Sequence, residues 1–368
     1  MPAVSLIDAS RIITESCVQS GAEVFVGYPI TPTNLVYSYS FERFPVALPA
    51  PDEITTLQWM SGFSSVGKFP VTATSFPGYA LMLESINMAF MMELPMLIIL
   101  SQRLGPSTGS ATTGAQGDLL LLRSSISGGF PIPVFCPSSF EDAWFLTHKA
   151  IETSFKLRCP VVLLTSKEMV MTNKSFDTGE LVPLKKLYWT APDEMEKYQS
   201  YYTNGKMVPD FIPLGNNQHQ VRINASTHDY TGLIRKTTPA AMQNTKRLYE
   251  KVIQQAKDFT FYEFQDSDKH DILLVSYDIT AEAVRESFNL LHAKQKNVSY
   301  LIVKTLIPVA NEISEIVSSF QKVFIIEENL TGLLAELYFG NNIPKNIFRI
   351  NKIGEMINPQ EIVEEILN

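Results

Sequence analysis

Apolar residues along the first 170 positions follow two alternating spacings. Short continuous apolar runs predict buried strands, and stretches with an apolar residue every three to four positions predict amphipathic helices. Strands that alternate with helices are typical of a parallel sheet covered on both faces. The predicted strands are 23–26, 71–74, 96–100, 132–135 and 161–164, and the predicted helices are 8–20, 35–39, 53–67, 77–91 and 141–153.

The pattern weakens after position 180 and returns after 268. Polar and aromatic residues mix over 181–268, where one helix is predicted at 239–257. A second alternating series follows, with strands at 272–276, 298–302, 323–327 and 347–350 and helices at 280–294, 311–319, 330–338 and 359–367. We therefore expect two α/β domains with open parallel sheets, 1–180 and 269–368, joined by an irregular linker, 181–268.

Composition excludes several classes of protein. Apolar residues make up 45% and charged residues 18% of 368 residues, which suits globular domains. The net charge of −8, without a basic stripe, argues against nucleic acid. Cys17, Cys136 and Cys159 are far apart, so we expect no disulfide framework, zinc site or iron–sulfur cluster on this chain alone.

The same composition predicts a compartment. Sparse cysteines suit a reducing cytosol. The most apolar segment, 88–100, contains Glu93 and is shorter than a membrane span, and the N-terminus lacks the basic start of a signal peptide. We expect a soluble cytoplasmic protein that does not bind a membrane.

The loop at 27–34 (GYPITPTN) is the first candidate site. It follows a predicted strand, and its two prolines restrict the backbone on either side of Thr31. Thr33 or Asn34 is placed to cap the next helix. Rigid polar loops at strand ends are where open α/β sheets bind ligands, although an ordinary strand-to-helix turn explains the pattern equally well.

Two further strand-to-helix junctions carry polar residues. Asp52 and Glu53 stand at a helix start, where an acid commonly caps the helix, and the small residues after them allow another helix or a partner subunit to pack closely. The segment 72–78 (TATSFPG) ends a strand in hydroxyls before a Pro-Gly helix entry. Its amides are placed to receive an anion, or form only a turn.

A fourth stretch joins a buried strand to a polar loop. Arg103 follows the apolar run 96–100 and precedes a Gly/Ser/Thr loop that continues to 116–118 (QGD). An arginine in this position is suited to bind a carboxylate through two hydrogen bonds, and the alternative is a surface ion pair. No G-x-G-x-x-G follows an early strand, which argues against a nicotinamide-binding domain.

In this order and spacing, the four stretches resemble the α subunits of multi-subunit 2-oxoacid:ferredoxin (acceptor) oxidoreductases, which include the 2-oxoglutarate and pyruvate enzymes. Two later stretches extend the resemblance over nearly the whole chain. Residues 227–229 (THD) resemble a family Glu-His-Asp stretch, and 327–335 (EENLTGLLA) resemble the family run Glu-x-Asn-x-x-Gly-x-Leu-Ala. For His228 itself, a structural role is favoured over a functional one.

The resemblance implies a thiamine diphosphate enzyme. The first domain would be a pyrimidine-binding domain and the second would resemble the C-terminal domain of transketolases. The family's cofactor glutamate falls on Glu53, whose carboxylate would bond N1′ of the aminopyrimidine and so favour the tautomer that removes the thiazolium C2 proton. By the same resemblance, Thr31 and Arg103 would bind the substrate carboxylate, and the further cofactor contacts would be Pro29, Ile30, Thr74 and Ser75.

The implied reaction is oxidative decarboxylation of a 2-oxoacid, with 2-oxoglutarate favoured, to acyl-CoA and CO2. This chain lacks the Gly-Asp-Gly of the diphosphate site, since Gly117-Asp118 is followed by Leu119. The resemblance therefore implies a β subunit that carries diphosphate, Mg²⁺ and an iron–sulfur cluster, ferredoxin or a similar acceptor, and, as in some relatives, a γ subunit. We expect no metal on this chain.

Two departures from the family pattern lie beside the predicted pocket. Relatives carry Thr-Lys and Glu-Gln where 111–116 reads ATTGAQ, so a lysine and an acid are lost. Phe76 stands where glycine or serine is common, which would narrow the pocket or reshape the interface. Two other readings remain open at this point: a non-oxidative thiamine-dependent decarboxylase subunit, and a scaffold subunit without chemistry, against which the retained Glu53, Thr31 and Arg103 argue.

Overall fold

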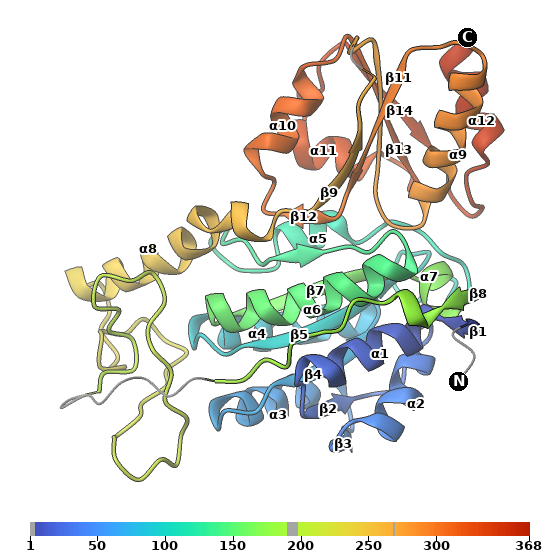
Figure 1. The fold of residues 1–368 in the computed structure, drawn as a ribbon. Helices are drawn as coiled ribbons and strands as arrows, with labels where there is room; N and C mark the ends of the chain where they lie inside the picture. Colours follow the sequence, from blue (N-terminus) through green and yellow to red (C-terminus); the bar gives the residue numbers. More distant parts are fainter. Residues whose placement is uncertain (1–3, 190–197, 268) are drawn as a thin grey trace.

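The computed structural model describes residues 4–189, 198–267 and 269–368. It contains a seven-stranded sheet of order β12-β6-β7-β5-β4-β2-β3 and a five-stranded sheet of order β14-β13-β10-β11-β9. The two sheets form two bodies, with the five-stranded one above the other in Figure 1. The predicted α/β class with two open sheets is confirmed, and both sheets are mixed rather than wholly parallel.

The seven-stranded sheet belongs mostly to the first half of the chain. Helix α1 packs against α6, and α3 packs against α4. Strands β4, β5 and β7 are buried along their whole length, which explains their continuous apolar runs. The strands are β2 (Val24–Gly27), β3 (Val46–Pro49), β4 (Pro70–Thr74), β5 (Met96–Gln102), β6 (Val134–Phe135), β7 (Pro160–Ser166) and β12 (Thr305–Ile307). The helices are α1 (Ala9–Ser20), α2 (Asn34–Arg43), α3 (Glu53–Ser65), α4 (Phe76–Met91), α5 (Leu119–Arg123), α6 (Phe140–Leu157) and α7 (Lys167–Met171).

The five-stranded sheet is built around β10, which pairs in parallel with β11 and β13. Its strands are β9 (Tyr262–Gln265), β10 (Ile272–Ser276), β11 (Val298–Val303), β13 (Lys322–Glu327) and β14 (Ile347–Asn351). Its helices are α9 (Thr280–Ala293), α10 (Asn311–Ser318), α11 (Leu333–Phe339) and α12 (Pro359–Leu367). These elements match the second predicted series closely.

Strands at the sheet edges differ from the sequence prediction. Strands β9 and β12 pair antiparallel with β11 and β6, so the sheets predicted as parallel carry antiparallel strands at their edges. Strand β12 also crosses from the later part of the chain into the first sheet, which ties the two bodies together. An exposed edge leaves backbone groups unpaired, and a short antiparallel strand covers them.

Short elements governed by tertiary pairing were missed. Strand β1 (Val4–Asp8) pairs antiparallel with β8 (Asn173–Asp177), although the two strands are far apart in the sequence. Strand β3 is only partly buried. The predicted strand 132–135 shrinks to β6, because Pro131 and Pro133 have no N–H for a ladder. Local apolar periodicity carries no signal for such pairings.

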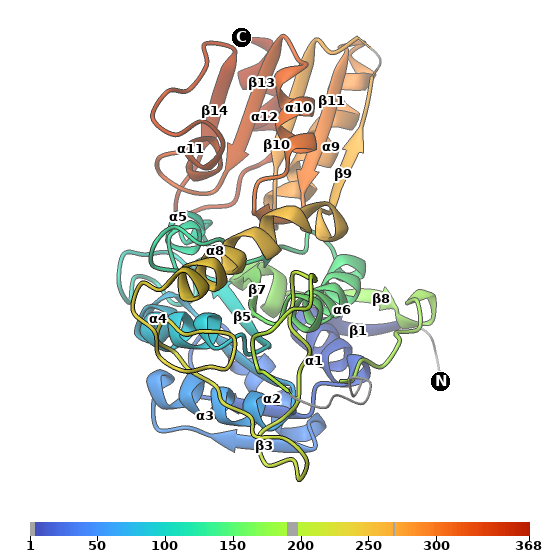
Figure 2. The same cartoon turned by 90° about the vertical axis from the view of Figure 1, so that its left-hand side faces the viewer.

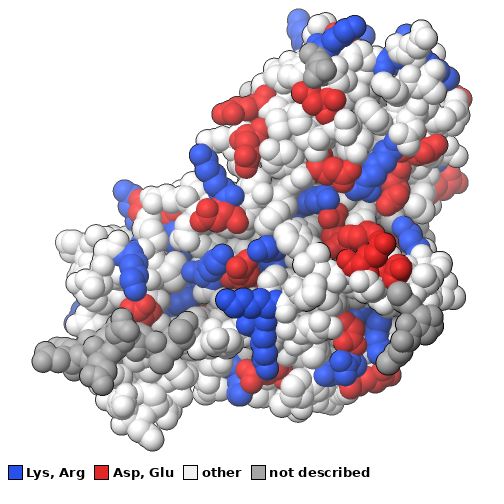
Figure 3. Space-filling view, viewed as in Figure 1, with Lys and Arg blue, Asp and Glu red and all other residues white. Residues whose placement is uncertain are grey.

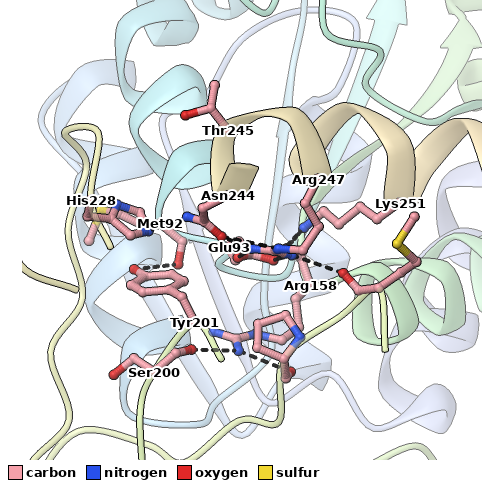
Figure 4. Close-up of polar contacts among 12 residues, drawn as sticks. Met92, Glu93, Arg158, Ser200, Tyr201, His228, Asn244, Thr245, Arg247 and Lys251 are labelled. Carbon is pink, nitrogen blue, oxygen red and sulfur yellow. Dashed lines mark hydrogen bonds and ion pairs between the residues drawn. The ribbon is translucent and has the colours of Figure 1, made fainter. Parts of the chain in front are cut away.

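The segment between the two sheets packs along the first body, as Figures 1 and 2 show. Its main helix, α8 (Pro239–Gln254), matches the predicted one. A buried ion network fastens α8 (Figure 4): the Glu93 carboxylate at the end of α4 binds Arg247 and, at 2.8 Å, Lys251. Burial alone would raise the pKa of Glu93, but Lys251 and Arg247 outweigh it and hold the pKa well below its usual range.

His228 has a structural environment. Its Nδ1 lies 2.7 Å from the Ser226 carbonyl oxygen and its Nε2 lies 2.9 Å from Asn244 Nδ2. Its ring packs on the Tyr201 ring, with 3.9 Å between the two ring centroids (Figure 4). Burial lowers the pKa of this histidine, which favours the neutral ring. With both ring nitrogens engaged, the geometry supports the structural reading.

Two surface properties follow from the fold. Among the described residues, no helix is long and apolar enough to cross a bilayer. On the face drawn in Figure 3, basic and acidic side chains are interspersed, with the largest acidic group at the right near the junction of the two bodies. That face carries no continuous basic stripe.

Candidate functional site

Buried polar atoms without partners gather at the carboxyl ends of β4, β5 and β7. Ser75 Oγ, Ser101 Oγ, Arg103 Nε and Thr165 Oγ1 have no hydrogen-bond partner in the described part of the chain. A buried polar group left unpaired costs about 1–3 kcal/mol, so such a group commonly serves a ligand or an ordered water. The carboxyl edge of a parallel sheet is also where ligands bind in open α/β folds. This edge is the candidate site.

The two acids at the start of α3, Asp52 and Glu53, have different environments. Asp52 is the N-cap, and its Oδ1 accepts a hydrogen bond from the Thr55 amide at 2.7 Å. The capping role is thereby filled without Glu53. Glu53 is only 6% exposed, and within the described residues its carboxylate has no hydrogen-bond partner. A buried carboxylate that the fold does not use is available for a ligand.

The position of the Glu53 side chain depends on a glycine. Gly78 lies in the first turn of α4, and a Cβ built there would lie 2.5 Å from Glu53 Oε1 and closer still to Thr74 Oγ1. Glu53, Thr74 and Gly78 therefore converge from α3, β4 and α4. Ser75, the N-cap of α4, makes no capping bond with its side chain. These residues form a polar cradle whose carboxylate and hydroxyls would fit a ring nitrogen.

The proline loop meets Arg103 at the same edge. Arg103 Nη1 donates a hydrogen bond to the Thr31 carbonyl oxygen at 2.5 Å, so the two predicted substrate residues are in contact. Pro29 is exposed, and Ile30 is half-buried. Thr33 is the N-cap of α2, as predicted, but its hydroxyl donates to the Ile30 carbonyl oxygen at 2.9 Å and makes no capping bond. The hydroxyl thus stiffens the loop instead of the helix.

A pocket of about 350 Å³ opens between the two bodies next to this loop. Its polar side chains include Arg103 and Asp118 from the first body and Asn329 from the second. Phe76 lines it as well, and its effect on the width of the pocket stays a prediction. Its remaining walls are largely apolar: Leu104, Pro106, Ala115, Leu330, Leu333 and Ile353. Of the predicted site residues only Arg103 lines this pocket; the cradle around Glu53 lies outside its lining.

Asp118 is the pocket residue that sequence reasoning passed over. It is 4% exposed, its Oδ2 has no hydrogen-bond partner in the described chain, and burial raises its pKa to about 7 despite the nearby Arg103 guanidinium. In the sequence it was read only as part of an incomplete Gly-Asp-Gly. The available signal was an acid immediately before four consecutive leucines, where an acid is expected only if it has a function or a partner.

Gln116 fastens the pocket loop to the second body. Its Nε2 donates to the Tyr277 carbonyl oxygen at 2.8 Å, and its Oε1 accepts from Thr280 Oγ1 at 3.0 Å and from the Glu328 amide at 2.6 Å. Its backbone amide also donates to the Glu328 carbonyl oxygen at 2.8 Å. The second body therefore sets the position of the loop that connects Arg103 with Asp118.

The described residues contain no candidate metal site. No group of three or more His, Cys, Asp or Glu side chains in that part of the chain is arranged to hold a metal ion. Cys17, Cys136 and Cys159 are buried free thiols, and burial raises the pKa of each. The expectation that another chain supplies the metals stays a prediction.

Comparison with known proteins places this geometry in a family. Residues 15–247 match the family model described as pyruvate flavodoxin/ferredoxin oxidoreductase, thiamine diP-binding. The 2-oxoglutarate synthase subunit KorA of Methanocaldococcus jannaschii is 26% identical over 99% of this chain and 99% of its own length. The 2-oxoglutarate oxidoreductase subunit KorA of Mycobacterium tuberculosis is 31% identical over 49% of this chain and 28% of its own.

Solved structures agree on the fold. A 2-oxoglutarate:ferredoxin oxidoreductase from Magnetococcus marinus, with 2-oxoglutarate, coenzyme A and succinyl-CoA bound, superposes with a TM-score of 0.90 at 24% identity. The match covers 99% of this chain and 65% of that one. A split-gene transketolase matches with a TM-score of 0.55 at 14% identity over 98% of this chain and 95% of its own. At these identities the likeness concerns the fold.

Proposed function

This chain belongs to the pyruvate flavodoxin/ferredoxin oxidoreductase family, and we propose that it is the α-type subunit of a 2-oxoacid:ferredoxin oxidoreductase. The reaction is the oxidative decarboxylation of a 2-oxoacid to acyl-CoA and CO2, with 2-oxoglutarate as the first candidate substrate. Relatives named for the 2-oxoglutarate reaction that align over nearly the whole chain support this choice. The protein would work in the cytoplasm, where its three buried free thiols stay reduced.

The observation that carries the proposal is the cradle of Glu53, Thr74 and Gly78. Glu53 is buried, its carboxylate makes no hydrogen bond or ion pair within the described residues, and Gly78 leaves the room against α4 that the Glu53 side chain occupies. This arrangement fits the polar edge of the thiamine pyrimidine ring. When bound, thiamine diphosphate supplies the electron sink for loss of CO2.

The residues of this chain would act around that group. Glu53 would hold a proton between its carboxylate oxygen and the ring nitrogen, and Thr74 would lie against the ring. Arg103 would pair with the substrate carboxylate and orient it, while the carbonyl of Thr31 keeps the guanidinium in place. The pocket walls would exclude water from the reacting carbon.

Partner chains complete the proposal. The diphosphate, Mg²⁺ and an iron–sulfur cluster would be carried by a β subunit, electrons would pass to ferredoxin or a similar acceptor, and a γ subunit would join in some assemblies. Relatives named as α subunits of 2-oxoacid:ferredoxin oxidoreductases support a multi-subunit enzyme.

The test is a Glu53→Gln variant produced together with its partner subunit. Removing a positioned acid–base group costs about 10²–10⁴-fold in rate, so turnover of the best substrate in a 2-oxoacid panel should fall by that factor while the complex still assembles. Iron and thiamine should co-purify with the unchanged complex. Unchanged turnover by the variant would indicate a scaffold subunit, and CO2 release without electron transfer would indicate a non-oxidative decarboxylase.

A further inference from the structure

We propose that Asp118 controls substrate binding at Arg103, because it must take up a proton before a 2-oxoacid carboxylate can occupy the pocket beside it. This inference rests on the function proposed above and concerns the same pocket. It assigns to Asp118 a role in specificity: the pocket accepts one anionic group on Arg103 only when the neighbouring acid is neutral.

Nothing structural in the described chain uses the Asp118 carboxylate. The residue precedes α5, but its side chain makes no capping bond to that helix. Its backbone amide, not its side chain, donates to Gln102 Oε1 at 3.2 Å. Oδ2 is buried without a hydrogen-bond partner in the described residues, and the residue lines the pocket together with Arg103. A carboxylate placed this way is free to interact with a bound ligand.

The titratable groups that face Asp118 come from three neighbouring elements. Arg103 follows β5 and lowers the pKa of the acid. Burial raises the pKa of the phenols of Tyr79 on α4 and Tyr277 after β10, and the nearby charge of Asp118 raises both further. Both phenols are therefore neutral. Arg123, at the end of the helix α5 that Asp118 precedes, is exposed. Arg103 is therefore the charge that balances Asp118 within the described residues.

Binding of a substrate changes that balance. The arriving carboxylate pairs with Arg103 and places a second negative charge beside Asp118 in a buried site. Two carboxylates that share a buried site cannot both stay ionised, so one takes up a proton. Asp118, whose pKa in the empty pocket is about 7, is the stronger base of the two. It gains one proton from solvent, and its new O–H becomes a donor to a substrate oxygen. No other bond is made or broken.

The test measures proton uptake on binding. The complex with its partner subunit and thiamine diphosphate is titrated calorimetrically with oxamate and with N-oxalylglycine, which mimic a small 2-oxoacid and 2-oxoglutarate but are not decarboxylated. Titrations run between about pH 6 and about pH 9 in buffers of different ionisation enthalpy. We expect constant Kd below about pH 7, a rise of about tenfold per pH unit above it, and uptake of about one proton per ligand in that upper range.

Two variants sharpen the test. Asp118→Asn should bind both probes with a Kd that no longer changes with pH, and without proton uptake. The matched control is Glu328→Gln, which alters another buried acid at the junction of the two bodies whose pKa burial also raises to about 7, but which does not line the pocket. The control should keep the slope and the proton uptake of the unchanged complex.

Specific outcomes would overturn the inference. One is binding by the unchanged complex without proton uptake, a result that needs no variant to fold. Another is an Asp118→Asn variant that weakens binding by the same factor at every pH, which would make Asp118 an anion that only orients Arg103. If 2-oxoacids are turned over but proton uptake is absent, this inference alone fails. If no 2-oxoacid is turned over and neither probe binds, the proposed function fails with it.

Discussion

Replacing Gly78 by alanine tests whether Glu53 acts from the position seen in the structure. The added Cβ would lie closest to Thr74 Oγ1, then 2.5 Å from Glu53 Oε1 and 2.8 Å from Glu53 Cγ, whereas real Cβ atoms essentially never approach within 3.0 Å, so both side chains must shift. The difference of 3.0 − 2.5 means that the carboxylate must move by at least about 0.5 Å. Because the end of the glutamate side chain is flexible, it will move before the backbone of α4 does.

The expected effects on folding and on rate differ in size. Overpacking costs about 1–3 kcal/mol, and alanine recovers about 1 kcal/mol of helix propensity relative to glycine, so the net loss of stability is about 0–2 kcal/mol. The rate is more sensitive, because a misplacement of about 1 Å in an active site can cost about 10²-fold. Gly78→Ala should therefore fold and assemble but turn over its 2-oxoacid about a hundredfold more slowly.

The assay compares turnover, thiamine content and thermal denaturation in the assembled complex. The matched control is Gly62→Ala on α3, the helix that Glu53 begins, where an added Cβ meets nothing within 4 Å. This control should keep full turnover and gain slightly in stability. A Gly78→Ala complex that keeps full turnover would refute the reasoning, because the displaced carboxylate would then have no role in the reaction.

Two further predictions concern the contacts that hold the site in place. Glu93→Gln leaves Arg247 and Lys251 buried without their counter-charge and should lower the free energy of unfolding by about 3–5 kcal/mol in chemical denaturation. Since folding lowers the pKa of Glu93 below its ordinary 4.5, its contribution is complete above about pH 4.5 and is lost as the pH falls further; a variant with the same acid sensitivity as the unchanged protein would contradict this. Gln116→Ala leaves the buried Glu328 amide without its acceptor, at a cost of about 1–3 kcal/mol, and should raise KM for the 2-oxoacid more than it lowers kcat, in steady-state kinetics; an unchanged KM would contradict this.

Elements with a local signal could be predicted from the sequence. The cap of α3 by Asp52, the end of α1 at Gly21 and the helix α8 each depend on residues within a few positions of one another. The same holds for the polar residues at strand ends that marked Glu53 and Arg103 as candidates. Strand β12, by contrast, is three residues long, and its place beside β6 depends on pairing between residues far apart in the sequence, Thr305 with Phe135 and Ile307 with Val134.

The sequence by itself determined the α/β class, the order of most strands and helices, and which polar side chains stand at the carboxyl ends of strands. Only the tertiary structure decided that Thr31 contacts Arg103, that Gly78 leaves room for the Glu53 side chain, and that Asp118 Oδ2 lies unpaired in a pocket closed by the second body. The physical reason is range. Periodicity, capping and proline act along a few residues, whereas a site at a sheet edge depends on which distant segments pack against one another and how much water they exclude.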